Sequence, residues 1–175
     1  WNNGATNGVS FIPASTQTYT VTGTDANGCQ STDQVVVTVN SLPVIGAGAD
    51  QVICQGGTVI LSGTGGVSYT WNNGVTNSNS FTPASTQTYT VTGTDANGCQ
   101  GTDQAVVTVN PLPAVDAGAA QAVCQGVQVT LNGSGAVSYT WNNGVNNGVS
   151  FACVSTQTYT VTGTDANGCT NTDQV

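Results

Sequence analysis

Apolar and polar side chains alternate along short stretches of this chain. The alternation is clearest in residues 87–93, where Tyr89 and Val91 share one face and threonines occupy the other. Because successive side chains of a β-strand point to opposite faces, this pattern predicts a strand with one buried side and one side in water. No segment shows the spacing of apolar residues that an amphipathic helix requires.

The same rule predicts six strands between residues 41 and 110, namely residues 46–54, 58–62, 67–72, 80–82, 86–94 and 104–110. The other side chains expected to point into a core are Val59, Leu61, Val67, Tyr69, Trp71, Ala105, Val107, Val109, Val129, Leu131, Val137, Tyr139 and Trp141. Short strands rich in β-branched residues and separated by Gly-Gly, Asn-Gly and Pro are typical of an antiparallel sandwich. We therefore expect an all-β protein made of tandem immunoglobulin-like antiparallel β-sandwich repeats.

The chain repeats itself every 70 residues. The tetrapeptide Trp-Asn-Asn-Gly begins at Trp1, Trp71 and Trp141, and residues 1–40 differ from residues 71–110 at six positions. Repeats this similar stack in a line, and they provide length, avidity or assembly more often than a single catalytic pocket. We expect the chain to be part of a longer array.

Three repeats divide the chain. We assign residues 1–40 to the second part of a first repeat, residues 41–110 to a complete second repeat, and residues 111–175 to a third repeat that lacks its final strand. Proline-containing linkers, Asn-Ser-Leu-Pro at 40–43 and Asn-Pro-Leu-Pro at 110–113, join them. Proline restricts its own backbone and that of the preceding residue, so we expect stiff linkers and roughly aligned repeats.

The composition excludes several function classes. The chain has no Lys, Arg, His, Glu or Met, and its eight Asp residues give a net charge of −8. General acid–base and nucleophilic catalysis need groups that are missing here, so we predict no enzyme and no catalytic residue. We also predict no cofactor and no metal centre, and a zinc site is disfavoured because the chain has no His and no close Cys-x-x-Cys pair. Phosphate binding needs Lys or Arg, so we predict no nucleic-acid partner. No apolar run reaches the roughly 20 residues of a membrane span.

Cysteine spacing predicts disulfides. Cys54 and Cys99 lie 45 residues apart, and Cys124 and Cys169 repeat that interval. We favour one bridge inside each repeat, formed in an oxidising, extracellular compartment. A bridge from Cys54 to Cys169 in the next repeat is the alternative, because in an immunoglobulin topology the two turns of one repeat lie at opposite ends. Such a bridge would lock neighbouring repeats end to end.

Three further features have competing interpretations. Cys153 replaces a proline of the other copies, and we consider that its thiol is buried, unpaired, or linked to another chain. The Asp-Ala-Asn-Gly segment starting at Asp95 is interpreted as a hairpin turn, since Asn-Gly favours positive φ, although with Asp103 it could also form a calcium site. Trp71 is interpreted as a core anchor rather than a platform for a sugar ring.

The sequence resembles a known family. The residues that carry the likeness are Pro-Leu-Pro at 111–113, Ala-Gly-Ala-Asp-Gln-Val-Ile-Cys at 47–54, Tyr-Thr-Trp at 69–71, Thr-Tyr-Thr-Val-Thr-Gly-Thr-Asp-Ala-Asn-Gly-Cys at 88–99 and Val-Val-Val-Thr-Val-Asn at 35–40. In this order they are similar to the immunoglobulin-like and PKD-like tandem repeats of large secreted surface proteins of Bacteroidetes. The resemblance implies export and a role as an adhesin, stalk or surface fibre.

Two function classes remain at this point. The first is a structural repeat region of an extracellular fibre, filament or stalk, with other copies or neighbouring repeats as partners. The second is an adhesive module whose loops, such as residues 72–79, bind surface glycans. These loops carry Asn, Gly, Thr and Ser rather than distinctive aromatic or charged residues, which favours the structural role. The outward strand faces lack the Lys that commonly protects exposed edges, so we expect repeats to associate through them.

Overall fold

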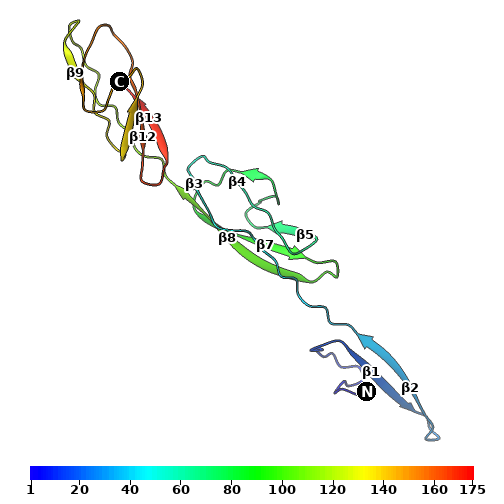
Figure 1. Ribbon diagram of the computed structural model, residues 1–175. Helices are drawn as coiled ribbons and strands as arrows, with labels where there is room; N and C mark the ends of the chain where they lie inside the picture. Colours follow the sequence, from blue (N-terminus) through cyan, green and yellow to red (C-terminus); the bar gives the residue numbers. More distant parts are fainter.

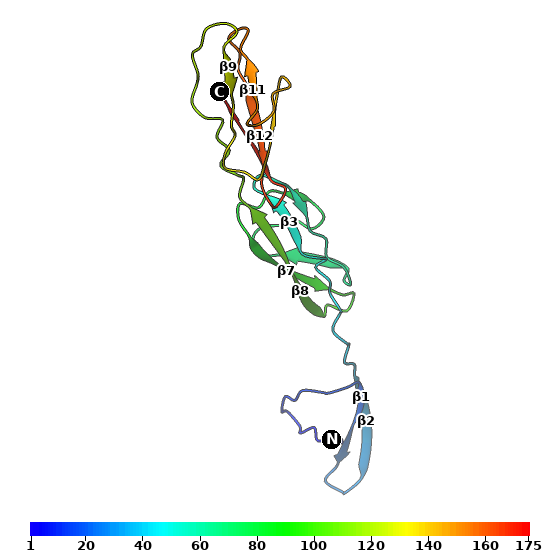
Figure 2. The ribbon, with the colours of Figure 1, turned by 60° about the vertical axis from the view of Figure 1, so that its left-hand side comes forward.

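The computed structural model describes all residues, 1–175, and it contains strands but no helix. Three β units follow one another along an elongated molecule, and the two termini lie at opposite ends (Figure 1). The view turned by 60° shows the same linear arrangement (Figure 2). The all-β architecture expected from the alternation is confirmed.

The second repeat is a sandwich of six strands, as the sequence predicted. The strands are β3 (Gln51–Cys54), β4 (Val59–Ile60), β5 (Ser68–Trp71), β6 (Ser80–Phe81), β7 (Gln87–Thr94) and β8 (Gln100–Asn110). One sheet has the order β3-β8-β7-β5, and β4 pairs with β6 in the other. β7 and β8 form an antiparallel hairpin, whereas β3 runs parallel to the end of β8.

Alternate residues of these strands fill the space between the two sheets. Leu61, Val91 and Val107 are almost completely buried, and Tyr89 and Trp71 lie in the same cluster. The inward positions predicted from the alternation are therefore confirmed for this set. Burying apolar area of this kind is the main favourable contribution to folding.

Two of the predicted core positions are wrong. Val67 and its counterpart Val137 are 71% and 72% exposed. Val67 precedes β5 and follows a turn in which Gly65 has a positive φ, so the strand alternation does not extend back to it. The hydroxyl of Tyr69 turns back to this segment, where it accepts from the backbone NH of Gly66 at 2.8 Å and donates to the Gly66 carbonyl at 2.6 Å.

The tryptophan of each later repeat anchors the core. The indole NH of Trp71 donates to Asn77 Oδ1 at 2.9 Å, and the same oxygen accepts from the backbone NH of Gly63 at 2.7 Å. Trp141 and Asn147 repeat the first contact at 3.0 Å. The interpretation of these indoles as core anchors is confirmed, since each buried ring has a partner for its polar atom.

The first and third repeats contain some of the strands that are found in the second repeat. The third has β9 (Gln128–Thr130) paired with β11 (Ser150–Ala152), and a sheet in the order β10 (Ser138–Trp141), β12 (Thr160–Thr164), β13 (Thr170–Gln174). The first consists of the hairpin β1 (Gln17–Thr24) and β2 (Gln30–Val37), preceded by residues without regular structure.

Candidate junction between the second and third repeats

Cys54 lies at the end of the second repeat from which the chain leaves. It is the last residue of β3, and the parallel register places it beside Asn110, the last residue of β8. The backbone NH of Gln55 donates to the Asn110 carbonyl at 2.8 Å and holds the two strand ends together. Because the linker to the third repeat starts at Asn110, Cys54 is placed at the junction.

Cys169 lies at the end of the third repeat at which the chain enters. It follows the turn between β12 and β13. Two contacts attach the start of the repeat to the same strand: Asn171 Nδ2 donates to the Pro113 carbonyl at 3.0 Å, and Asp173 Oδ2 accepts from the backbone NH of Ala117 at 2.8 Å. The linker at 110–113 and the turn that carries Cys169 therefore lie next to each other at the start of the third repeat.

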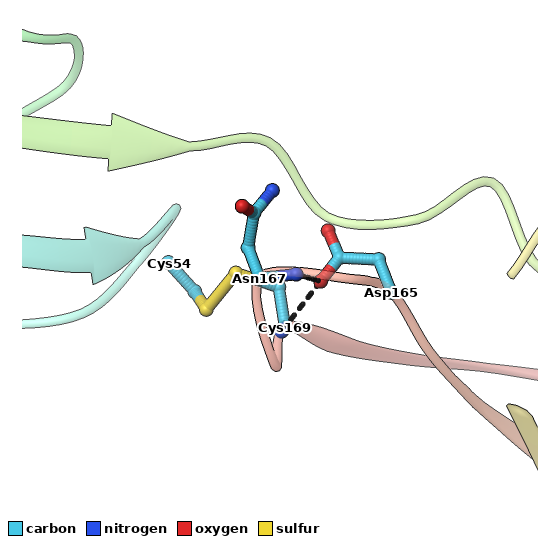
Figure 3. Close-up of a disulfide and its surroundings, with 4 residues drawn as sticks. All are labelled: Cys54, Asp165, Asn167 and Cys169. Atoms are coloured by element: carbon cyan, nitrogen blue, oxygen red, sulfur yellow. Dashed lines mark hydrogen bonds between the residues drawn. A yellow bond between two sulfur atoms is a disulfide. The ribbon is translucent and has the colours of Figure 1, made fainter. Parts of the chain in front are cut away.

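A disulfide joins Cys54 to Cys169 across this junction (Figure 3). The two Cα atoms are 5.5 Å apart, within the range that disulfides need, and Cys169 is completely buried. The bond connects residues 115 positions apart in the sequence. The alternative between-repeat pairing is thus the one that the structure contains.

The favoured pairing of Cys54 with Cys99 is wrong, and strand length explains why. Cys99 precedes Gln100 at one end of β8, whereas Cys54 lies beside Asn110 at the other end. β8 has 11 residues, and at about 3.3 Å per residue the two cysteines are about 35 Å apart. The predicted bridge between Cys124 and Cys169 is absent because Cys169 is bonded to Cys54, and Cys29, Cys99, Cys124 and Cys153 are free.

The turn that carries Cys169 is shaped by its own aspartate. Asp165 Oδ1 accepts from the backbone NH groups of Asn167 and Cys169, each at 2.8 Å (Figure 3). The turns at Asp95 and Asp25 make the same two bonds, although their cysteines are free. The turn geometry is therefore present without the disulfide, and the hairpin-turn interpretation is confirmed.

The second aspartate of the considered calcium site also bonds to backbone. Asp103 Oδ2 accepts from the NH of Ala47 at 2.8 Å, and this bond, together with one from Gln104, lowers the pKa of Asp103. Asp173 has a lowered pKa through the same bonds from Ala117 and Gln174. These aspartates attach the first segment of each repeat to its last strand. This role was not predicted from the sequence, in which Asp103 was considered only as part of a calcium site.

Other candidate positions lie away from the junction. Cys153 follows β11, where its backbone NH donates to the Val127 carbonyl at 3.0 Å, and it borders a groove of about 540 Å³ with Val123, Phe151 and Val175. In the loop 72–79, the side chain of Asn77 is used for internal hydrogen bonds. His, Cys, Asp and Glu side chains form no group of three or more suited to a metal ion. No helix of the structure is long and apolar enough to span a bilayer.

No protein-family model and no curated protein matches this chain. Among solved structures it is similar to the extracellular cadherin domains 1–4 of Protocadherin Gamma B7, with 13% identity, coverage of 93% of this chain and 57% of that chain, and a TM-score of 0.31. The human Desmocollin-1 ectodomain is similar at 14% identity, 86% and 40% coverage, and a TM-score of 0.29.

Proposed function

We propose that this chain is a structural repeat region of an extracellular surface fibre, filament or adhesin stalk, of the kind whose repeats its sequence resembles. The observation that carries the proposal is the disulfide between Cys54 and Cys169. It joins two repeats that the backbone already connects, so the junction is crossed by two covalent links. A covalently closed junction suits a part whose task is to hold repeats in line.

The location of the proposed fibre is argued from the same bond. Disulfides persist in oxidising surroundings and are rare in the cytosol. The absence of Lys and Arg also removes every cleavage site for trypsin-like proteases, which is an advantage outside the cell. We therefore place the repeats on the cell surface or in secreted material.

The proposed partners are other copies of the same repeat. Strand faces turned to solvent carry mainly Thr, Ser, Asn and Gln, and the chain holds no Lys to oppose pairing at sheet edges. Static light scattering across a range of concentrations tests this part of the proposal. A mass that rises with concentration is expected, and a constant monomer mass would contradict association.

Imaging of the whole protein tests the structural role. An antibody raised against residues 41–110 is applied to intact cells and to secreted material, followed by electron microscopy with gold labelling. We expect label along thin extracellular filaments. Label confined to the cell interior, or to points without filaments, would contradict the proposal.

A further inference from the structure

The disulfide also changes which part of the chain carries tension. Cys54 and Cys169 are separated by 115 positions, and the bond brings their Cα atoms to 5.5 Å. We infer that this bond is a mechanical by-pass, which removes residues 55–168 from the path of a pulling force. The inference deepens the proposed stalk function, because a stalk is the setting in which tension along the chain matters.

The by-pass follows from connectivity alone. A force applied at the two termini passes through residues 1–54, the two sulfur atoms and residues 169–175. Most of the second and third repeats therefore lies on a closed loop that the force does not enter. Only β3 and β13, at the two ends of that loop, remain on the loaded path of these repeats. Unfolding the remaining strands releases no length between the ends.

In a longer array, bridges of the same kind at neighbouring junctions would add a second load path beside the bond between Cys54 and Cys169. The free turn cysteine Cys99 and the exposed Cys124 are the counterparts of Cys169 and Cys54. They are 25 residues apart. If adjoining copies supplied their partners, this stretch would carry the load through two repeats, with an extended length of about 85 Å. The 140 residues of two unbridged repeats would extend to about 490 Å.

With those additional bridges in place, the stretch between Cys99 and Cys124 would have little slack. Eleven of its residues form β8, which is already extended, and the proline-containing linker follows directly. A strand rises about 3.3 Å per residue, close to the limit for any polypeptide. Tension on such a path stretches backbone that is already straight. The result is a rod that resists lengthening even when its sandwiches lose their fold.

Cleavage of the chain within the closed loop, like unfolding of the loop, leaves the two ends of the molecule connected. A single cut between residues 55 and 168 leaves both fragments joined through Cys54 and Cys169. The by-pass therefore preserves the continuity of the fibre after a proteolytic nick in most of the second or third repeat. Reduction of the disulfide removes this protection.

Single-molecule force measurements on the full chain test the inference. With handles at both termini, the oxidised protein is expected to extend to about 210 Å, the length of the 61 loaded residues at about 3.5 Å each. Addition of a phosphine reductant should release a further 400 Å or so, because about 115 residues enter the path. An oxidised chain that extends to about 600 Å, or a length unchanged by reduction, would overturn the inference.

Two variants and a digest complete the test. Cys54→Ser should reach about 600 Å without reductant, even if its repeats fold poorly, whereas Cys153→Ser, the matched control, should keep the short length. After limited chymotrypsin digestion, the two fragments of a chain cut between residues 55 and 168 should separate on a gel only after reduction. Fragments from a cut in that range that separate without reduction would contradict the by-pass. The outcome is independent of the imaging above, since the by-pass would exist in a chain that forms no fibre.

Discussion

The second and third repeats are identical at 43 of the 65 positions that align residues 41–105 with 111–175, and their structures differ at one edge. The second continues to Asn110, whereas the third ends at Val175, the counterpart of Ala105. In the second repeat, residues 107–110 pair with β3. In the third, the counterpart of β3 at residues 121–124 forms no strand, and β12 starts at Thr160, three residues later than β7 in the repeat register. The parallel edge strand of the second repeat is thus paired with the end of its last strand.

The core clusters of the two repeats also differ in size. Nine buried residues form the core cluster of the second repeat, against five in the third. The groove of about 540 Å³ in the third repeat is bordered by Val123 and Val175. Apolar side chains there lack the neighbours that Val107 and Val109 provide in the second repeat. A few strand residues therefore close one side of a sandwich.

The first repeat has a regularly paired hairpin but few buried side chains. Its hairpin has the same register as β7 and β8, so local pairing forms without the other strands. Val35 is nevertheless 47% exposed, whereas its counterpart Ala105 is 1% exposed. Backbone pairing is thus a property of the hairpin, and burial requires the facing strands that begin each repeat.

Completing the third repeat should have the largest effect. Adding Val-Val-Thr-Val-Asn after Val175 is expected to bury one valine fully and one partly, as at Val107 and Val109, and to stabilise this repeat by about 3 kcal/mol. Hydrogen exchange should then show new protection at residues 121–124. A Ser-Gly-Ser-Gly-Ser extension is the control. Equal protection with both extensions would contradict the role given to the last strand.

A glycine substitution compares the covered and uncovered hairpins at one position. A Cβ at Gly93 would lie 2.3 Å from Cδ1 of Ile45, whereas a Cβ at Gly23 would meet nothing within 4 Å. We expect Gly93→Ala to destabilise the second repeat by about 1–2 kcal/mol through overpacking. Gly23→Ala should change stability by less than about 0.5 kcal/mol. Urea denaturation measures both, and equal effects would refute the difference in packing.

Acid should weaken the attachment of the first segment of a complete repeat. Hydrogen bonds from Ala47 and Gln104 lower the pKa of Asp103 below its ordinary value of 3.8. The stability from this carboxylate is present above the unfolded-state pKa and is lost as the pH falls through the folded-state pKa. Protection of the Ala47 amide should therefore decrease on acidification.

Two substitutions test this effect, which is the smallest of the three. The test variant, Asp103→Asn, should reduce the pH dependence of the stability of the second repeat, and the matched control is Asp33→Asn in the first repeat. Asp33→Asn should leave that dependence unchanged, because Asp33 bonds only to the NH of Gln34. An identical acid response in wild type and Asp103→Asn would show that this carboxylate contributes nothing to the attachment.

Some features of the junction could be predicted from residues alone and some could not. The turn at Asp165 forms in the same way in three copies, because Asp and Asn-Gly act within a few residues of one another. The disulfide partner of Cys54 could not be selected with confidence from spacing, because the 45-residue interval pointed to Cys99. Strand direction and the length of β8 make that pairing impossible.

By itself, the sequence determined the local properties of this protein: strands from the alternation of side chains, turns from Asp-Ala-Asn-Gly, and a linear order from the 70-residue period. These depend on interactions between residues that are near in the chain. The tertiary structure decided the bond between Cys54 and Cys169 and the exposure of Val67. Both depend on which ends of the strands meet in space, and a one-dimensional pattern does not contain that distance.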